Sequence, residues 1–185
     1  MQPLHIITSR LLIRHLTLSD GADFHRYRSN PEVTRYQGFD VMTMEQATTF
    51  ITNNAVKNYG KAGEWVQYAI EHTASGKLVG DCAIRLKEYD ARIAEVGITI
   101  SHLAQKNGFA KEAMLGILAF LFDEKGIHRV VETVDAENTA SIHLMNSIGF
   151  RQEGHFIENI FFKGKWGSEF QYAMLKREWD TIKVR

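Results

Sequence analysis

Apolar side chains alternate along three consecutive segments in the middle of the chain. In residues 66–70, and again in residues 94–101, every second residue is apolar, and the apolar stretch of residues 78–86 lies between them. A period of two places one face of a segment on a core and is typical of strands. Turn-forming residues at 75–77 and at 89–92 separate the segments. The pattern predicts three antiparallel strands joined by short turns.

Elsewhere the apolar residues recur at helical spacing. Thr43 and Gln46 form a capping box, in which each side chain satisfies backbone donors at a helix start, and the apolar face that follows comprises Ala47, Phe50, Ile51 and Ala55. An earlier helix is expected to begin at Ser19 or Asp20 and to stop near Asn30, ahead of Pro31. A long helix is expected from about Gly108 to Lys125, and its inner stripe comprises Ala110, Ala113, Met114, Ile117, Leu118 and Leu121.

The remaining segments complete a mixed sheet. Residues 11–15 predict a first strand, and residues 129–135 predict a short buried strand. Asn138 caps a helix that Gly149 ends, and strands over residues 150–162 and 170–175 form a closing hairpin across a turn at 163–165. The expected order is βααβββαβαββ, an α+β sheet covered by helices. Without repeats or a Pro/Ser-rich linker, residues 1–185 are expected to form a single domain.

Composition narrows the class of protein. The 185 residues carry 22 basic and 22 acidic side chains, so the chain lacks the basic excess of a general nucleic-acid or membrane-surface binder. The one cysteine, Cys82, favours a reducing compartment and is expected in the core. Residues 1–5 lack a signal-peptide pattern, and no apolar run is long enough to span a membrane. We therefore expect a cytoplasmic protein without nucleic-acid or membrane partners.

The exit from the 94–101 strand into the long helix is the most informative stretch. A polar loop with Gly108 at the helix start leaves backbone N–H groups unpaired, and the helix dipole adds positive potential there. Such a loop can hold a phosphate or pyrophosphate, and glycine lets the backbone approach the anion closely. A plain helix start is the alternative. The segment is neither a Walker loop nor a dinucleotide fingerprint.

A second polar junction follows the 129–135 strand. Asn138 is a good helix cap and Ser141 lies one turn further on, so a cap beside a solvent-facing serine is again the alternative. The two junctions occur at consecutive strand-to-helix connections. If the two strands are parallel neighbours that splay apart, both helix starts flank one crevice, which is a usual place for a ligand.

These junctions resemble a known family. The pattern Gln105-x-x-Gly108-x-Ala110 is similar to the Q/R-x-x-G-x-G/A acetyl-CoA signature of the GNAT N-acetyltransferases. Further segments look like the branch related to the ribosomal-protein N-acetyltransferases, and they keep their order across nearly the whole chain. They are Ser9 to Arg14 with Asp20, Ala94 to Gly97, Arg129, Asn138-x-x-Ser141, Ile148 to Phe150 with Glu153-Gly154, Gly164-x-Trp166 and Glu178-Trp179.

The resemblance implies a GNAT fold, with a mixed, mostly antiparallel sheet of about seven strands, splayed at the cofactor site and flanked by about four helices. It also implies acetyl transfer from acetyl-CoA to a primary amine by direct attack in a ternary complex, without a metal. Asn138 corresponds to a family residue that contacts the pantetheine or orders a water. The cofactor-binding residues it implies are Ile98, Thr99, Ile100, Gln105, Lys106, Asn107, Gly108, Phe109, Ala110, Lys111 and Asn138.

Two residues are candidates for the chemistry. Glu95 is the candidate base, acting through water, because it lies on the face of its strand opposite the apolar residues; the alternative is a solvated residue or one paired with an arginine. Ser141 is the candidate acid for the departing thiolate, because Met145 occupies the position where many relatives have a tyrosine. Thr133 stands where some relatives have a catalytic glutamate. The adjacent Glu132 is expected on the other face of the strand.

The acceptor stays open at this stage. A protein N-terminal amine, a polyamine, an aminoglycoside and a free amino acid are all compatible with the balanced charge. A non-catalytic CoA-binding module is a further alternative, and Met145 and Thr133 favour it. Ser168, where relatives often have an aspartate, leaves the acceptor contacts undefined, and exposed sheet edges are compatible with a homodimer. Aromatic side chains that could line an acceptor pocket are Tyr36, Phe39, Trp65 and Tyr68.

Overall fold

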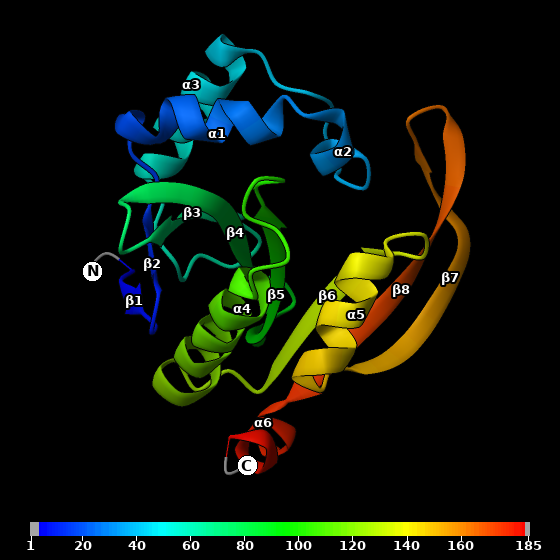
Figure 1. The fold of residues 1–185 in the computed structure, drawn as a ribbon. Helices are drawn as coiled ribbons and strands as arrows, with labels where there is room; N and C mark the ends of the chain where they lie inside the picture. The colour runs from blue at the N-terminus through cyan, green and yellow to red at the C-terminus, as the bar shows by residue number, and fades with distance from the viewer. Residues whose placement is uncertain (1–3, 184–185) are drawn as a thin grey trace.

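A computed structural model describes residues 4–183, and it contains one eight-stranded sheet in the order β1-β2-β3-β4-β5-β6-β8-β7 (Figure 1). Residues 1–3, part of the start that lacks a signal-peptide pattern, lie outside the described range, as do residues 184–185. The strands are β1 (Ile6–Ile7), β2 (Leu11–His15), β3 (Val66–His72), β4 (Lys77–Lys87), β5 (Asp90–Ile100), β6 (Arg129–Asp135), β7 (Arg151–Phe162) and β8 (Lys165–Leu175). The helices are α1 (Gly21–Arg28), α2 (Pro31–Thr34), α3 (Met44–Ala55), α4 (Phe109–Ala119), α5 (Thr139–Ile148) and α6 (Lys176–Ile182).

The predicted α+β sheet and the order of its main elements are confirmed. The structure adds the two-residue β1 and the terminal α6, and it starts β8 at Lys165 instead of Phe170. The long helix predicted to Lys125 is α-helical only to Ala119 and then continues as a π-helical turn over Phe120–Glu124. The capping box of Thr43 and Gln46 starts α3 as expected. Towards the end of α3, however, Asn54 is buried and Ala55 is exposed, because the helix turns Ala55 away from the sheet.

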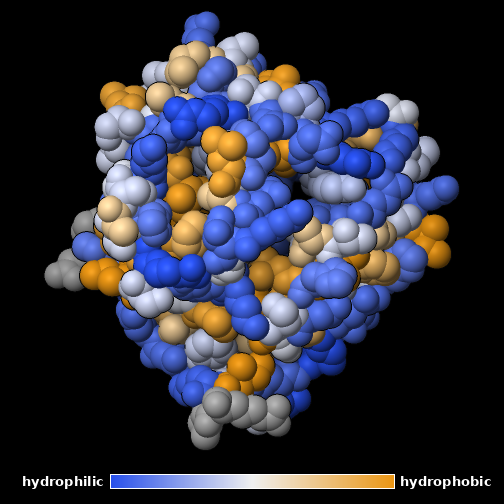
Figure 2. Space-filling view, viewed as in Figure 1, coloured by the Kyte–Doolittle hydropathy of each residue, from blue (hydrophilic) through white to orange (hydrophobic). Residues whose placement is uncertain are grey.

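Helices cover both faces of the sheet and create two apolar cores. In Figure 1, α1 and α3 lie above β3 and β4, and α4 and α5 lie in front of the sheet. The smaller core joins α1 and α3 to the sheet through residues such as Phe24, Ile51 and Ala69. The larger core lies under α4 and includes the free thiol of Cys82, which is buried as predicted. Figure 2 shows hydrophilic side chains over most of the outer surface in this view, with smaller apolar groups between them.

Buried ion pairs attach the N-terminal helices to the sheet. Asp81 of β4 is fully buried and accepts hydrogen bonds from Tyr27 (2.5 Å), Arg28 and Gln67. Asp20 was expected as a possible helix cap, but its carboxylate instead accepts two hydrogen bonds from Arg14, both of 2.8 Å. A carboxylate that meets a bidentate guanidinium gains more than from a single backbone N–H. Ion pairs as well as apolar contacts therefore hold residues 20–28 against the sheet.

The feature that positions the site is the junction between β5 and β6. These strands are parallel, but they pair over only three residues each, from Ile93 to Glu95 and from Arg129 to Val131. β5 continues to Ile100 along β4, and β6 continues to Asp135 along β8. The two halves of the sheet therefore diverge beyond Glu95, which confirms the predicted pair of splayed parallel strands.

Candidate active site

Two adjoining pockets lie where β5 and β6 diverge. One has a volume of about 330 Å³ and extends towards α4, and the other has a volume of about 180 Å³ and extends along β6. Both are lined by Tyr36, Gln37, Ile98, Asn138 and Ser141, so they form one continuous groove. We call the first the cofactor end and the second the acceptor end. A groove at the carboxyl ends of diverging parallel strands is the expected ligand position in such sheets.

The strand β5 offers free backbone groups to the cofactor end. Ile98, Thr99 and Ile100 pair with β4 on one side, while pairing with β6 has already ended at Glu95. All three residues line the cofactor end, as do Gln105 and Ala110. The Gln105 side chain donates to the Ile100 carbonyl at 3.2 Å and so ties the loop to the end of the strand. A free strand edge can accept an extended amide-containing ligand as a further strand.

The loop before α4 has the backbone that an anion site requires. Gly108 is the N-cap and adopts φ +80°, and Lys106 has φ +64°. The positive φ of Gly108 is a conformation that glycine adopts without the steric cost of a side chain. This loop fits a pyrophosphate because the first N–H groups of α4 have no carbonyl partner within the helix and can donate to an anion. Lys111 lies one turn into α4, and its Nζ donates to the Ser147 carbonyl of α5 at 3.0 Å.

A polar network supports this loop from the other side. Glu112 accepts hydrogen bonds from the Thr8 hydroxyl at 2.6 Å, and from the backbone N–H and Nε of Arg10, both at 2.7 Å. Burial alone would raise the pKa of Glu112, but these hydrogen bonds lower it to about 2. Arg10 also donates to the Asn107 carbonyl at 3.1 Å and stacks on Phe109. Phe109 and Asn107 thus shape the loop. Of the predicted loop residues, only Gln105 and Ala110 line the groove, whereas Lys106, Asn107, Gly108, Phe109 and Lys111 do not.

The β6–α5 junction supplies the wall between the two ends. The Asn138 side chain accepts a hydrogen bond from the Ser141 N–H at 3.1 Å, which confirms the predicted cap. The Ser141 side chain is half-buried and lines both ends of the groove. Met145, one turn further on, is fully buried in the larger core and lines neither end. Ser141 is therefore the hydroxyl that α5 presents to the groove.

Glu95 lines the acceptor end, and it is also an ion-paired residue. Its Oε2 accepts hydrogen bonds from Arg85 Nε at 3.0 Å and from Lys87 Nζ at 2.7 Å. Arg85 in turn stacks on the ring of Trp65, which lines the same pocket. The predicted alternative of an arginine partner is thus correct for one carboxylate oxygen. Ion pairs with these two cations thus hold the Glu95 carboxylate at the edge of the groove.

Glu132 lines the acceptor end together with Glu95, Thr133 and Asp135, although it was not among the predicted site residues. Glu132 is buried and Thr133 is exposed, so these adjacent residues lie on opposite faces of β6, as strand alternation predicts. Both reach the pocket because β6 leaves β5 one residue before Glu132. The sequence signal was a single acidic residue in the apolar run Val130-Val131-Glu132-Thr133-Val134.

The four aromatic candidates separate into two groups. Tyr36 and Trp65 line the acceptor end. Phe39 instead lies over the Arg28 guanidinium, with 4.3 Å between the guanidinium carbon and the ring centroid, and Tyr68 is fully buried in the larger core. Neither Phe39 nor Tyr68 lines the acceptor end, and Tyr68 lies on the face of β3 that the larger core covers. Ser168 holds the β7–β8 hairpin by accepting from the Glu158 N–H at 3.0 Å.

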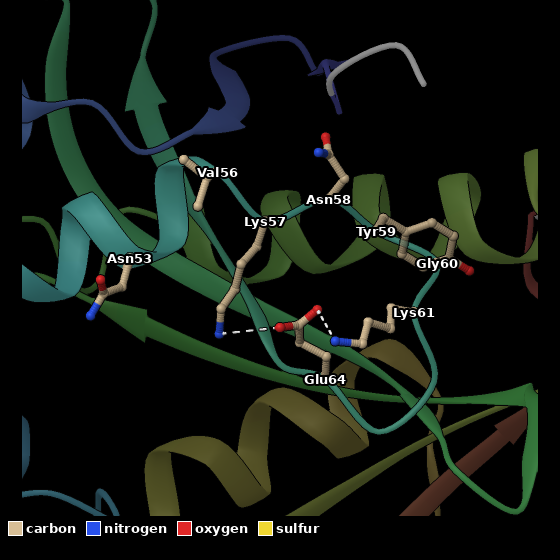
Figure 3. A pocket seen from close by; sticks show the side chains of 8 residues that line it. All are labelled: Asn53, Val56, Lys57, Asn58, Tyr59, Gly60, Lys61 and Glu64. Atoms are coloured by element: carbon tan, nitrogen blue, oxygen red, sulfur yellow. Dashed lines mark ion pairs between the residues drawn. The ribbon is translucent and has the colours of Figure 1, made fainter.

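Another hollow lies on the loop between α3 and β3, away from the diverging strands (Figure 3). It has a volume of about 620 Å³, and its charged groups are already paired, since Glu64 lies 3.8 Å from Lys57 and 3.7 Å from Lys61. Its lining comprises Asn53, Val56, Lys57, Asn58, Tyr59, Gly60, Lys61 and Glu64.

Within residues 4–183, no group of three or more His, Cys, Asp or Glu side chains could hold a metal ion, and no helix is long and apolar enough to cross a membrane.

Comparison with known proteins agrees with this geometry. The acetyltransferase (GNAT) domain matches residues 10–151. The uncharacterized N-acetyltransferase YnaD of Bacillus subtilis (strain 168) is 32% identical over 96% of this chain and 100% of its own length. A crystal structure of a GNAT-family acetyltransferase from Bacillus anthracis superimposes with a TM-score of 0.86 at 29% identity, covering 95% of this chain and 100% of that one.

A more distant structure shares the fold. It is spermidine N-acetyltransferase from Vibrio cholerae in complex with CoA and spermine, with a TM-score of 0.78 at 23% identity, covering 92% of this chain and 98% of that one. GNAT enzymes use acetyl-CoA. The matched domain, the full-length similarity to YnaD and the splayed sheet lead to one conclusion: this chain belongs to the GNAT family and is an N-acetyltransferase.

Proposed function

We propose that the enzyme acetylates a positively charged primary amine, either a small polycationic molecule or a protein N-terminal amine. The observation that carries this proposal is the charge of the acceptor end. Its wall contains the carboxylates of Glu95, Glu132 and Asp135 and, among the described residues, no lysine, arginine or histidine. An ammonium is attracted to such a wall, and the faces of Trp65 and Tyr36 add cation–π attraction.

The same wall disfavours one of the acceptors left open by the sequence. A free amino acid carries a carboxylate next to its amine, and that carboxylate would face the carboxylates of Glu95 and Asp135 without a cation in the pocket lining. A polyamine, an aminoglycoside or a peptide N-terminus brings its ammonium without this penalty. The spermidine acetyltransferase that shares the fold supports a polyamine as the first acceptor to examine.

The proposed roles at the cofactor end follow from the contacts described above. Acetyl-CoA supplies the acetyl group as a thioester. The free edge of Ile98, Thr99 and Ile100 pairs with the pantetheine arm, and the loop from Gln105 to Lys111 holds the pyrophosphate. Asn138, in the wall shared by both ends, contacts the arm or a water beside it.

At the acceptor end, Glu95 is the proposed first contact of the ammonium. Its Oε2 is occupied by Arg85 and Lys87, so Oε1 is the oxygen that can meet the ammonium or a bridging water. The deprotonated nitrogen then bonds to the acetyl carbonyl carbon while the carbon–sulfur bond breaks. Ser141 is the proposed proton donor to the departing sulfur, directly or through water, because it is the hydroxyl of α5 that lines both ends of the groove.

A panel of amines tests the acceptor, with release of free CoA thiol as the measured signal. The panel contains spermidine, an aminoglycoside, a short peptide with a free N-terminus, the same peptide with a blocked N-terminus, and free amino acids. We expect turnover with at least one of the first three and none with the blocked peptide. Preferential turnover of free amino acids would contradict the charge argument. Tight CoA binding without acetylation of any amine would favour the non-catalytic module instead.

A further inference from the structure

Glu132 presents a carboxylate that the described contacts leave unsatisfied. The side chain is 7% exposed, and its Oε2 is fully buried without a hydrogen-bond partner within residues 4–183. An ionised carboxylate buried without a partner is strongly disfavoured, so such a group either holds a proton or waits for a ligand. Glu132 also lines the acceptor end of the groove, which gives a ligand access to it.

The groups around Glu132 make it the more basic member of a carboxylate pair. Glu95 of β5 lines the same pocket and is ion-paired with Arg85 and Lys87 of β4. From β8 its strand partner is Tyr172, whose hydroxyl donates to Gln152 of β7 at 3.3 Å. α5 contributes Ser141 to the same pocket, and Asp135 lies further along β6. Burial and, secondly, the charge of Glu95 raise the pKa of Glu132 to about 8.

A raised proton affinity matters for this reaction because the acceptor arrives as an ammonium. Proton transfer from an alkylammonium of pKa about 10.4 to an ordinary glutamate of pKa about 4.3 is unfavourable by about 10⁶-fold. Transfer to a group with a pKa of about 8 is unfavourable by only about 250-fold. A base is most effective when its proton affinity approaches that of the group it deprotonates. Glu132 meets this requirement, whereas Glu95 is already engaged in ion pairs with Arg85 and Lys87.

We infer that Glu132 is the residue that holds the proton removed from the attacking amine, while Glu95 stays ionised beside it. The inference rests on the proposed acetylation of an ammonium acceptor. The N–H bond breaks and its electron pair stays on nitrogen, which forms the new bond to the acetyl carbon. The proton moves to a Glu132 oxygen, directly or through water bound at Glu95 Oε1. The electrons of the carbon–sulfur bond leave with sulfur. As that bond breaks, the nitrogen loses its second proton, which reaches the sulfur through Ser141 or water, and Glu132 returns the first proton to solvent before the next turnover.

The first test is the pH dependence of kcat/KM in wild type, Glu132→Gln and Glu95→Gln, with the amine that wild type acetylates fastest. The ionisation of that amine is titrated separately and its contribution is divided out. Wild type should retain an acid-side limb with a midpoint near 8. In Glu132→Gln, kcat at neutral pH should fall by about 10²- to 10⁴-fold and the limb should disappear. In Glu95→Gln the limb should persist at lower pH, because loss of the adjacent charge lowers the pKa of Glu132.

Two further variants separate chemistry from structure. Glu132→Asp keeps a carboxyl group, so it should retain a limb and more activity than Glu132→Gln. Glu169→Gln is the matched control: Glu169 pairs with Asp135 across β6 and β8, its carboxylate accepts from Asn159 at 2.6 Å, and it does not line the acceptor end. This control should retain wild-type kcat and the wild-type pH dependence. CoA affinity should be unchanged in all four variants.

Unfolding in urea gives a readout that needs no activity. The folded-state pKa of Glu132 is raised, so the folded protein binds more protons than the unfolded chain between the ordinary value of 4.5 and about 8. The wild-type free energy of unfolding should therefore include a contribution that decreases as the pH rises through that window. Glu132→Gln should lack this decrease. The measurement stands even if the amide variant has a lower unfolding midpoint, because it compares slopes.

Each alternative has its own outcome. A Glu132→Gln variant with near wild-type kcat and an unchanged limb would overturn the inference. Loss of the limb in Glu95→Gln but not in Glu132→Gln would assign the proton to Glu95. A low kcat in both Glu132 variants, together with an unchanged acid-side limb of the pH profile, would show that Glu132 has only a structural role. The proposed function fails separately, when wild type acetylates none of the amines.

Discussion

The two ends of the groove offer different kinds of groups to a ligand. At the cofactor end the groups available to a ligand are backbone groups: the free edge of β5 and the first N–H groups of α4. At the acceptor end they are side chains contributed by separate segments, with Trp65 preceding β3, Glu95 on β5 and Glu132 on β6. A backbone site depends on the conformation of one short segment, whereas the side-chain site depends on how three segments are packed together.

This difference explains how the two ends can vary. A backbone cradle suits a ligand shared by a whole family, because many side chains are compatible with it. The acceptor end can change its ligand through a single substitution, since its charge comes from three carboxylates. Glu132 illustrates this, because it lies one residue from the position at which some relatives have their catalytic glutamate.

The largest expected effect tests whether the cofactor end is a backbone site. Gly108→Ala places a side chain at φ +80°, where an L-residue costs about 1–2 kcal/mol. If CoA binding requires this conformation, the dissociation constant should rise by about 5- to 30-fold, which is the same energy expressed as affinity. Calorimetric titration with CoA measures this change.

The control for this variant places an alanine at another glycine with a positive φ, outside the loop. Gly126, at the other end of the long helix, has φ +64° and open space around it. Gly126→Ala should bind CoA like wild type, because its strain lies outside the loop. Equal affinity in the two variants would remove the Gly108 loop from the cofactor site.

An intermediate effect is expected where the two ends meet. Ser141→Ala should lower kcat by roughly 10-fold, at the low end of general acid catalysis, because CoA thiolate is a good leaving group. CoA affinity should stay close to wild type, and high pH should not restore the rate. Ser147→Ala, on the same helix, removes a hydroxyl that donates only to the Leu144 carbonyl, so it should be as active as wild type. Equal kcat in both variants would exclude Ser141 from the chemistry.

The smallest effect is expected at the network behind the loop. Glu112→Gln keeps an oxygen for Thr8 and loses the charge opposite Arg10, so it should cost about 1 kcal/mol of unfolding free energy at neutral pH. The folded-state pKa of Glu112 is depressed to about 2 from 4.5, so this contribution is present above about pH 4.5 and is lost as the pH falls towards 2. Urea unfolding at several pH values measures it.

Glu124→Gln makes the same change at an exposed position near the end of the long helix. It should alter stability little at any of these pH values. A difference between Glu112→Gln and wild type that persisted at pH 2 would show that the carboxylate charge is not its source.

Much of the fold was predictable because it rests on local signals. Thr43 and Gln46 start α3, Asn138 starts α5, and Gly149 at φ +96° ends it, each through contacts within a few residues. Alternating apolar residues determined β3 and β5 for the same reason. The short β1 and the terminal α6 were missed, since a two-residue strand has no period to detect and α6 has little apolar pattern of its own.

The two ends of the candidate site differ in the same way, since one depends on local signals and the other on tertiary packing. The sequence by itself determined the conformation of the loop before α4, because the positive φ of Gly108 and the start of α4 are properties of one segment. Tertiary structure alone decided the acceptor end. The register of β5 against β6 ends at Glu95, and that divergence opens the pocket that Glu132 and Thr133 both line. Packing between distant segments also buries Met145 and Tyr68 in the core. Local periodicity specifies each strand, but only contacts between distant segments specify where two strands part.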